Sequence, residues 1–380
     1  MRTVRRLLYA EVLGAILFVA VAFLALFYFI DFVEELDDVG QGTYGVGQAA
    51  LYCLLLVPGH LYELLPIAVL IGAIYAMARL AQSSEFTILR TAGLGPGRAL
   101  SLLAKLGIAF GVFSLVLGDA VAPWFDQQAQ QLRDSARSAA TAGAPADAQA
   151  SGAAAWLKDR RTAAPGAMPP GERLDTLRVG RVQGDGGLEQ VQVFEFDADG
   201  QLLTRVQAAS ARIDGAWLRL REVEISSWHA GADGNLPALE KRATLDWPTT
   251  LTPAVVAAAV SPLKSMSTLN LYRYTSHLSD NEQAAQGHEI QFWKKALNPL
   301  ASLVMLALAL PFAYLHARAG GVSLKVFGGI LLGISFVLLN NVSTHLGLLR
   351  DWTPWVAAAA PSVIYMLMSL AAFSWLVRYR

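Results

Sequence analysis

The stretch VLGAILFVAVAFLALFYFI, residues 12–30, contains no charged residue. At about 1.5 Å per residue, a helix of this length crosses the hydrocarbon core of a bilayer. The stretch follows the basic segment MRTVRR, as the apolar region of a signal peptide would. It is too long for such a region, however, and no small-residue cleavage site follows it. We therefore expect residues 12–30 to form a retained membrane span.

Five further apolar segments predict spans of similar length. They lie at about 49–77, 99–121, 292–314, 324–344 and 353–377. Of the 380 residues, 54% are hydrophobic and only 16% are charged, whereas soluble domains have about 25% charged residues. The sequence thus predicts a polytopic α-helical membrane protein with six transmembrane helices, three on each side of a polar insert.

Composition argues against several other classes of protein. Lys+Arg and Asp+Glu both number 30 and no basic block occurs, so nothing indicates a nucleic-acid partner. Cys53 is the only cysteine, which rules out an intrachain disulfide and any cysteine-based metal motif. The P-loop pattern and the H-E-x-x-H and G-x-S-x-G patterns are absent. We expect no catalytic residue, no cofactor and no metal site in this chain.

Lysine and arginine in the short loops predict the orientation of the spans. They precede the first span, flank the loop between the second and third, lie between the fourth and fifth, and end the chain. The loop 31–45 on the opposite side contains none. We expect both termini to be cytoplasmic and the polar insert to lie on the outer side of the membrane.

The insert changes character along its length. Residues 136–170 are rich in Ala, Gly and Pro, and we expect a mobile loop there. From Leu174 apolar and polar residues alternate, and turn signals such as GDGG and DADG separate the runs. This pattern predicts an inserted antiparallel β domain that is curved into a small sandwich or an open, jelly-roll-like sheet. From Ser267 the sequence becomes helical and amphipathic.

These features divide the chain into three expected parts. Residues 1–123 hold the first three spans and a short cytoplasmic helix at 83–93. Residues 124–266 form the β domain, and residues 267–380 hold an amphipathic connector and the last three spans. The alternating large side chains of the β domain predict an apolar trough. Its candidate lining residues are Phe194, Phe196, Trp217 and Leu220.

The loop between the second and third spans, LAQSSEFTILRTAGLGPGR at 80–98, predicts a miniature capped helix. A serine at its start is a suitable N-cap, Glu85 lies in the first turn, and Gly93 is a natural C′ residue. Phe86 and Leu89 form a narrow apolar stripe. Such a helix is too short to be stable alone, so it is either a docking element, like the coupling helices of ABC transporter permeases, or an amphipathic loop on the membrane surface.

Polar residues within the predicted spans are further candidates for function. His60 and Glu63 stand one turn apart, where they form a proton relay or substrate contact, or simply face other helices or the outer interface. Asp119 lies at the outer end of the third span and fits an interfacial position. Asn340 and Asn341 either line a cavity or make hydrogen bonds between helices.

Two G-x-x-x-G pairs, at 107–111 and 329–333, permit close approach of helices. The motif is short and common. It fits internal packing and a subunit interface equally well.

Several segments resemble one family of membrane proteins. They are FVEELDDVGQGTYG at 32–45, RLAQSSEFTILRTAGLGPGR at 79–98, VAPWFDQQAQQLR at 121–133, WLKD at 156–159 and QFWKKALNPL at 291–300. With the order of three spans, β domain and three spans, they make the chain similar to the YjgP/YjgQ family over nearly its whole length. This family comprises the permease subunits of the lipopolysaccharide export ABC transporter. The GQGTY segment resembles its LptG branch rather than its LptF branch.

The resemblance implies a function and a set of partners. The chain would be a permease subunit that extracts lipopolysaccharide from the bacterial inner membrane and passes it to a periplasmic bridge towards the outer membrane. A separate ATPase would hydrolyse ATP, and the β domain would lie in the periplasm. The implied partners are the sister permease LptF, a dimer of the ATPase LptB, LptC, the bridge protein LptA, lipopolysaccharide and membrane lipids.

The resemblance also gives roles to particular residues. Glu85 would be the coupling-helix carboxylate that meets a basic residue of the ATPase, and Phe86, Leu89 and Arg90 would belong to the same short element. The β-domain trough would receive acyl chains.

One feature departs from the family pattern. Relatives often carry basic residues at the outer end of the first span, where lipid A phosphates would bind. This chain instead has acidic residues at that place, namely Asp31, Glu34, Glu35, Asp37 and Asp38. Phosphate binding at this end would need positive charge from the partner subunit or bridging divalent cations. A polytopic lipid-modifying enzyme and a scaffold for envelope assembly remain as alternatives, and co-purification of a P-loop ATPase would distinguish them from a transporter.

Overall fold

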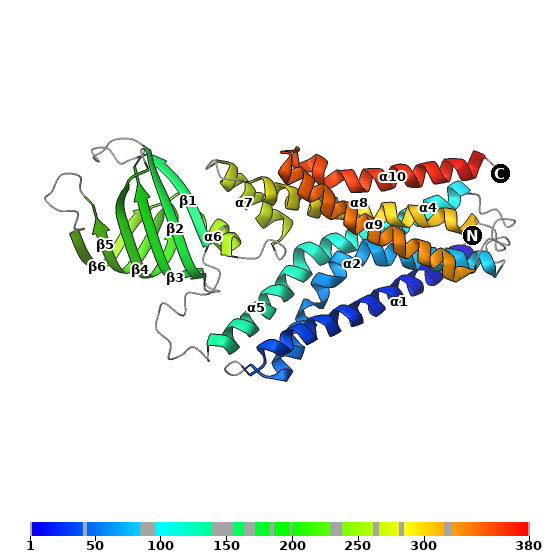
Figure 1. Ribbon diagram of the computed structural model, residues 1–380, viewed down its shortest axis with the longest axis horizontal. Helices are drawn as coiled ribbons and strands as arrows, with labels where there is room; N and C mark the ends of the chain where they lie inside the picture. The colour runs from blue at the N-terminus through cyan, green and yellow to red at the C-terminus, as the bar shows by residue number, and fades with distance from the viewer. Residues whose placement is uncertain are drawn as a thin grey trace. The chain divides into compact units, whose positions relative to one another are not determined.

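The computed structural model describes residues 2–40, 44–83, 96–138, 155–162, 172–182, 186–197, 200–228, 238–260, 266–280, 285–314 and 321–378. The chain divides into two compact units. One comprises Met1–Ala140 and Gln286–Arg380, and the other comprises Thr141–Ala285. The first unit is helical and the second contains a β-sheet (Figure 1).

Long helices build the first unit. In chain order they are α1 (Arg2–Glu35), the 3-10 turn η1 (Leu36–Asp38), α2 (Val46–Gln82), α4 (Pro96–Val116), the π-helical turn η2 (Leu117–Val121), α5 (Ala122–Ser138), α8 (Gln286–Tyr314), α9 (Val322–Leu349) and α10 (Pro354–Arg378). Among the described residues, six helical segments are long and apolar enough to cross a membrane, and α4, η2 and α5 share one of them. The prediction of six spans is therefore confirmed.

The core of the helical unit is centred on α2. This helix is the most buried of the six candidate spans, and it packs against α1, α5, α8 and α9. Leu70, Ile74 and Met77 of α2 are fully buried together with Met305 and Leu306 of α8. An almost uniformly apolar helix needs such an arrangement, because it has no face that prefers water.

Both G-x-x-x-G pairs serve packing inside this unit. A Cβ atom added to Gly107 would lie 3.1 Å from the Leu303 Cα atom of α8, and one added to Gly329 would lie 2.8 Å from the Ile74 side chain of α2. The missing side chains thus let α4 approach α8 and let α9 approach α2. Internal packing accounts for both motifs.

The described residues of the second unit form a six-stranded antiparallel sheet, here called the β roll. Its strands are β1 (Ala155–Thr162), β2 (Glu172–Val182), β3 (Gly187–Phe196), β4 (Leu202–Asp214), β5 (Trp217–Ser227) and β6 (Ala238–Pro248). Each strand pairs with its sequence neighbour, so the strand order is β1-β2-β3-β4-β5-β6 (Figure 1). Helix α6 (Pro253–Val260) contacts β1 and β2, and α7 (Thr268–Asp280) follows. The antiparallel β domain that the alternating pattern predicted is confirmed.

Alternate residues of the strands form a buried inner face. Leu157, Leu177, Val193 and Val206 stand opposite one another across four adjacent strands, and all four are buried. The alternation is interrupted on β3 and β5, where Gln190 and Glu222 adopt positive φ angles of 54° and 53°. Irregularities of this kind bend a sheet and increase its twist, as the curvature of the β roll requires.

The structure differs from the expected domain boundaries at two places. The segment 136–170, expected to be a mobile loop, contains the end of α5 and all of β1. β1 forms because β2 offers it a ladder eight residue pairs long, from Ala155 opposite Val179 to Thr162 opposite Glu172. The β domain was expected to begin at residue 124, but α5 belongs to the helical unit because it continues the third span and packs on α2.

Candidate functional site

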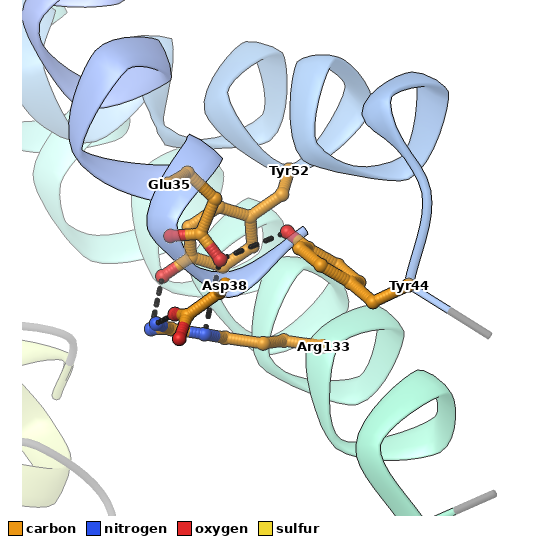
Figure 2. A network of polar contacts seen from close by, with 5 residues as sticks. All are labelled: Glu35, Asp38, Tyr44, Tyr52 and Arg133. Atoms are coloured by element: carbon orange, nitrogen blue, oxygen red, sulfur yellow. Dashed lines mark hydrogen bonds and ion pairs between the residues drawn. The ribbon is translucent and has the colours of Figure 1, made fainter. Parts of the chain in front are cut away.

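A network of polar side chains gathers at the acidic end of α1, around Arg133 of α5 (Figure 2). The Arg133 Nε atom lies 3.2 Å from Glu35 Oε1, and its Nη2 atom donates a hydrogen bond of 2.5 Å to Asp38 Oδ2. One guanidinium therefore binds two carboxylates from neighbouring turns. Arginine suits this role because its planar group presents several donors in a fixed geometry.

Two tyrosines complete the network (Figure 2). The Tyr44 hydroxyl donates to Glu35 Oε1 at 2.9 Å. Arg133 Nη1 donates to the Tyr52 hydroxyl at 3.4 Å, and the guanidinium carbon lies 5.2 Å from the centroid of the Tyr52 ring. Burial, and after it the Glu35 carboxylate, raises the pKa of the Tyr44 phenol above its ordinary value. Tyr44 therefore remains a hydrogen-bond donor well into the alkaline range.

The chain reversal between α1 and α2 positions these groups. Gly40 has φ +95°, which favours glycine, and its N–H donates to the Tyr44 carbonyl at 2.9 Å. Tyr44 is 1% exposed and packs with Ala49 and Ala136 against Phe32. The ring thus fills a small apolar cluster between α1, α2 and α5, while its hydroxyl reaches the carboxylate.

A second contact joins α1 to α2 nearby. His60 Nε2 lies 2.6 Å from Asp31 Oδ2, and the Phe27 ring lies 5.3 Å from the imidazole, between ring centroids. His60 therefore faces a neighbouring helix, as the simpler of the two sequence interpretations expected. Three of the five acidic residues at this end of α1 are thus paired, while Glu34 and Asp37 are exposed.

Lys295 of α8 is the centre of a second polar group in the helical unit. It is 7% exposed, its Nζ atom lies 5.8 Å from the centroid of the Tyr62 ring, and the carboxylates of Glu63, Asp119 and Asp126 interact electrostatically with it. These residues come from α2, η2 and α5. An ionisable side chain within a candidate span is a default candidate for function, and the carboxylates that interact with Lys295 come from three other elements.

The π-helical turn η2 and the helical turn before it contact both α2 and α8. Gly118, its second residue, packs against Tyr62, since an added Cβ atom would lie 2.3 Å from the ring carbon Cε2. On the turn before η2, Ser114 accepts a hydrogen bond of 3.0 Å from the Asn298 side chain of α8. The absence of a side chain at Gly118 therefore lets the third span lie close to Tyr62. Turns of this kind are frequent at functional sites.

The four candidate trough residues of the β roll do not share one face. Leu220 is buried on the inner face, whereas Trp217 is 49% exposed and Phe194 and Phe196 lie on the opposite face. The Phe194 ring lies 5.9 Å from the Trp156 ring, between centroids, and Arg205 lies over it. Selecting residues by size overlooked the period of two, which sends neighbours such as Val193 and Phe194 to opposite sides.

Comparison of the sequence with known proteins shows which family the chain belongs to. The sequence model of the lipopolysaccharide export system permeases LptF/LptG matches residues 6–376. The chain belongs to this family. It is 27% identical over 368 residues to the lipopolysaccharide export system permease protein LptG of Haemophilus influenzae, covering 96% of both chains. It is also 27% identical over 346 residues to LptG of Escherichia coli K12, covering 90% of this chain and 89% of that one.

The remaining candidates of this LptF/LptG family member are two asparagines of α9 and the residues of the loop after α2. Asn340 is partly buried on α9, where its carbonyl accepts a 2.8 Å hydrogen bond from Thr344, and Asn341 is exposed. Glu85, Phe86, Leu89 and Arg90 lie outside the described residues.

Sequence analysis did not select Arg133 or Lys295, although both stand in segments that resemble the family. A signal for each was present. Lys295 is a charge within the segment 292–314 predicted to span the membrane. Arg133 lies in α5, beyond residues 99–121, which the sequence predicts as the third span. Its importance depends on the acidic end of α1, almost 100 residues earlier in the chain.

Proposed function

We propose that this protein is a permease subunit of an ABC transporter that extracts lipopolysaccharide from the inner membrane and passes it to a periplasmic bridge towards the outer membrane. The observation that carries the proposal is the family match over residues 6–376. The architecture fits it, with three candidate spans on each side of a β domain. The names of the relatives favour transport over the alternatives of a lipid-modifying enzyme or an assembly scaffold.

The energy for transport would come from a separate ATPase. We assign docking of an LptB dimer to the loop between α2 and α4, with Glu85 facing a basic residue of the ATPase and Phe86, Leu89 and Arg90 beside it. The support is the sequence of this loop, a capping serine followed by a carboxylate and an apolar stripe. LptF would be the sister permease, and LptC and LptA would receive the lipid.

The orientation follows from the positive charges of the short loops. Both termini and Ser83 would be cytoplasmic, and the β roll, including Gln201, would be periplasmic. Ser83 and Gln201 are both exposed, so each accepts a single-cysteine substitution in a Cys53→Ala background. An impermeant thiol reagent added to intact cells should label Gln201→Cys and spare Ser83→Cys. The reverse pattern would overturn this orientation.

Within the β roll, we assign contact with acyl chains to the inner face. Its buried aliphatic side chains include Leu220, and they match the chemistry of hydrocarbon chains. Photo-crosslinkers at Leu220 and at Trp217 compare the two faces. ATP-dependent adducts at Leu220 and few at Trp217 would support the inner face, whereas adducts at Trp217 alone would place the lipid on the outer face.

The acidic end of α1 would fix the helix rather than bind phosphate. Arg133 is already bound to Glu35 and Asp38, and His60 to Asp31. Positive charge for the lipid A phosphates would then come from LptF or from bridging divalent cations. If divalent cations bridge the phosphates, their removal should weaken lipopolysaccharide binding to the purified complex. Unchanged binding would indicate that LptF supplies the positive charge.

Co-purification and transport test the proposal directly. The chain would be purified from its host membrane with its partners, its bound lipid identified by mass spectrometry, and lipid release from proteoliposomes measured with and without ATP. A P-loop ATPase, bound lipopolysaccharide and ATP-dependent release would support the function. A complex that holds no ATPase and releases no lipid would favour an enzyme or a scaffold.

A further inference from the structure

The segment WLKD, residues 156–159 of β1, divides between the two faces of the β roll. Leu157 and Asp159 face inward and are buried. The Asp159 carboxylate accepts a hydrogen bond of 2.7 Å from the Thr249 hydroxyl, so this half of the segment stabilises the fold. Trp156 and Lys158 face outward and are exposed. Folding of the roll does not call for a tryptophan at an exposed position, so Trp156 needs another explanation.

Trp156 is one of four outer-face side chains that alternate between aromatic and cationic from β1 to β4. Arg178 on β2 stands opposite Trp156, and its guanidinium carbon lies 6.0 Å from the centroid of the Trp156 ring. Arg205 on β4 stands opposite Phe194 on β3, and its guanidinium carbon lies 5.8 Å from the centroid of the Phe194 ring. Trp156, Arg178, Phe194 and Arg205 are called the outer platform below.

The two rings of the outer platform touch although their strands are not neighbours. Strands that are two apart lie about 10 Å from each other, whereas the centroids of the Trp156 and Phe194 rings are 5.9 Å apart, with 27° between the ring planes. The rings therefore lean towards each other over β2, where Phe194 stands opposite the short side chain of Thr176. They make an apolar surface on a face that elsewhere carries polar residues such as Gln192 and Gln207.

The outer platform is accessible and positively charged. Trp156 is 56% exposed. Within the described part of the chain, neither Arg178 nor Arg205 forms an ion pair with a carboxylate, and Arg205 donates to the Gln207 side chain at 3.4 Å. Arg219 on β5 differs, because its guanidinium lies 2.7 Å from the Asp214 carboxylate. The charges of the two platform arginines are therefore available to an anion.

Rings beside guanidinium groups suit a ligand that carries both apolar C–H groups and negative charge. The C–H groups of a sugar ring carry partial positive charge and pack on the negative face of an aromatic ring. Guanidinium groups bind phosphate and carboxylate through paired hydrogen bonds. An acyl chain would cover the rings but leave both guanidinium groups without an anion. A phosphorylated or acidic sugar engages both kinds of side chain.

We propose that the outer platform binds the anionic sugar part of the transported lipid. This inference rests on the proposed function, because lipopolysaccharide joins acyl chains to sugars that carry phosphate and carboxylate groups. Such groups lose their hydration at high cost in an apolar environment, so they cannot follow acyl chains to the inner face. The outer platform offers them partners on the other face of the same sheet.

Binding of a soluble ligand to the complete complex tests the outer platform. The ligand is the phosphorylated core oligosaccharide that mild acid releases from lipopolysaccharide, and saturation-transfer NMR measures its dissociation constant. We expect saturable binding that weakens as the salt concentration rises, because exposed charges are screened. Removal of the phosphate groups should weaken binding by about tenfold. Absence of binding by the phosphorylated oligosaccharide would overturn the proposal.

Matched substitutions on the same face separate the outer platform from general surface charge. Trp156→Ala and the double variant Arg178→Gln/Arg205→Gln should each raise the dissociation constant by about fivefold or more. Trp217→Ala and Arg219→Gln remove a half-exposed tryptophan and an exposed arginine of β5, and each should change the constant less than twofold. Equal losses in the platform and control variants would overturn the proposal.

A conservative variant guards against a defect of folding. Trp156→Phe keeps an aromatic face at this position, so it should bind the oligosaccharide better than Trp156→Ala. If Trp156→Ala does not fold, Trp156→Phe and the double arginine variant still decide the question. Wild-type affinity in the folded double arginine variant would contradict the proposal.

Photo-crosslinking shows what reaches the outer platform during transport. Benzoylphenylalanine in place of Phe194 keeps an aromatic side chain there, and the same group at Trp217 reports the same face outside the platform. During ATP turnover we expect lipopolysaccharide adducts mainly at Phe194. Alkaline hydrolysis then removes the ester-linked acyl chains. An adduct that keeps the mass of the sugars supports the proposal, whereas one reduced to a single fatty acid would overturn it.

An acidic segment of a partner protein is the competing occupant of the outer platform. A poly-glutamate peptide tests this alternative in the same binding assay. If the peptide binds as tightly as the oligosaccharide and loses affinity equally in Trp156→Ala, the platform recognises a protein and the proposal is wrong. Weaker binding that does not respond to Trp156→Ala would support the sugar.

The outcomes also distinguish this inference from the proposed function. If the wild-type complex neither binds nor releases lipopolysaccharide, the proposed function fails. If the wild type transports lipid and the platform variants bind the oligosaccharide as the wild type does, the function stands and the outer platform is not a sugar site.

Discussion

Replacing Arg133 by methionine should release the acidic end of α1 from α2 and α5. The substitution leaves Glu35, whose side chain is 8% exposed, and Asp38 without their shared cation. Removing one partner of a buried ion pair costs about 3–5 kcal/mol, because the other charge stays buried. The Arg133 side chain is 30% exposed, so water already screens part of the pair. We expect the lower limit, about 3 kcal/mol.

The only cysteine of the chain is a natural probe of this opening. Cys53 follows Tyr52 on α2 and is completely buried. A thiol reagent can reach it only when the helices around it separate, so its labelling rate reports the free energy of local opening. A loss of about 3 kcal/mol corresponds to labelling about a hundredfold faster. The rate would be measured on purified protein in detergent at neutral pH.

Two comparisons make the expectation specific. Arg79 and Glu11 also join α2 to α1, at 3.4 Å, but their side chains are 58% and 30% exposed. Arg79→Met should therefore cost less than about 1 kcal/mol. Adding Glu35→Gln and Asp38→Asn to Arg133→Met should recover most of the loss, because no buried charge remains. If Arg133→Met labels as slowly as the wild type, or if the triple variant is no slower than Arg133→Met, the network does not anchor α1 electrostatically.

Three further predictions address other parts of the chain. Tyr44→Phe removes a donor to buried Glu35 and should lower the free energy of unfolding by about 1 kcal/mol at neutral pH. The folded state raises the pKa of the Tyr44 phenol, so the wild type should lose stability as the pH rises above about 10. Melting curves recorded from pH 8 upward should show a smaller loss of stability in Tyr44→Phe than in the wild type. Gly118→Ala would place a Cβ atom 2.3 Å from the Tyr62 ring and should lower the free energy of unfolding by about 1–3 kcal/mol, as measured by thermal unfolding. Gly97→Ala is the control and should leave stability unchanged, because nothing lies within 4 Å of the added Cβ atom. If the proposed function holds, Glu85→Arg should weaken retention of the proposed ATPase partner by roughly 30-fold or more. Phe86→Ala and Leu89→Ala should weaken it by smaller, salt-insensitive factors. Normal retention and export by Glu85→Arg would contradict the proposed coupling role of this loop.

The sequence by itself determined the architecture of this protein. Apolar runs such as residues 12–30 must cross a bilayer or be buried, so their lengths and spacing were enough to predict six spans. The alternation around Val191 and Val193 likewise predicted strands, because the side-chain period of a strand is two. Both signals are local, which is why a single sequence contains them.

The tertiary structure alone decided which polar residues meet. Glu35 and Arg133 are 98 positions apart, and Asp159 and Thr249 are 90 apart, so no local pattern joins them. Their pairing depends on which helix faces lie together and how far the sheet rolls. The same reason explains the error over Phe194 and Leu220: each is apolar and lies in a strand, but only the register and the bulges determine which face it occupies. Burial then gives these contacts their strength, because a charge removed from water needs a partner that the fold must bring to it.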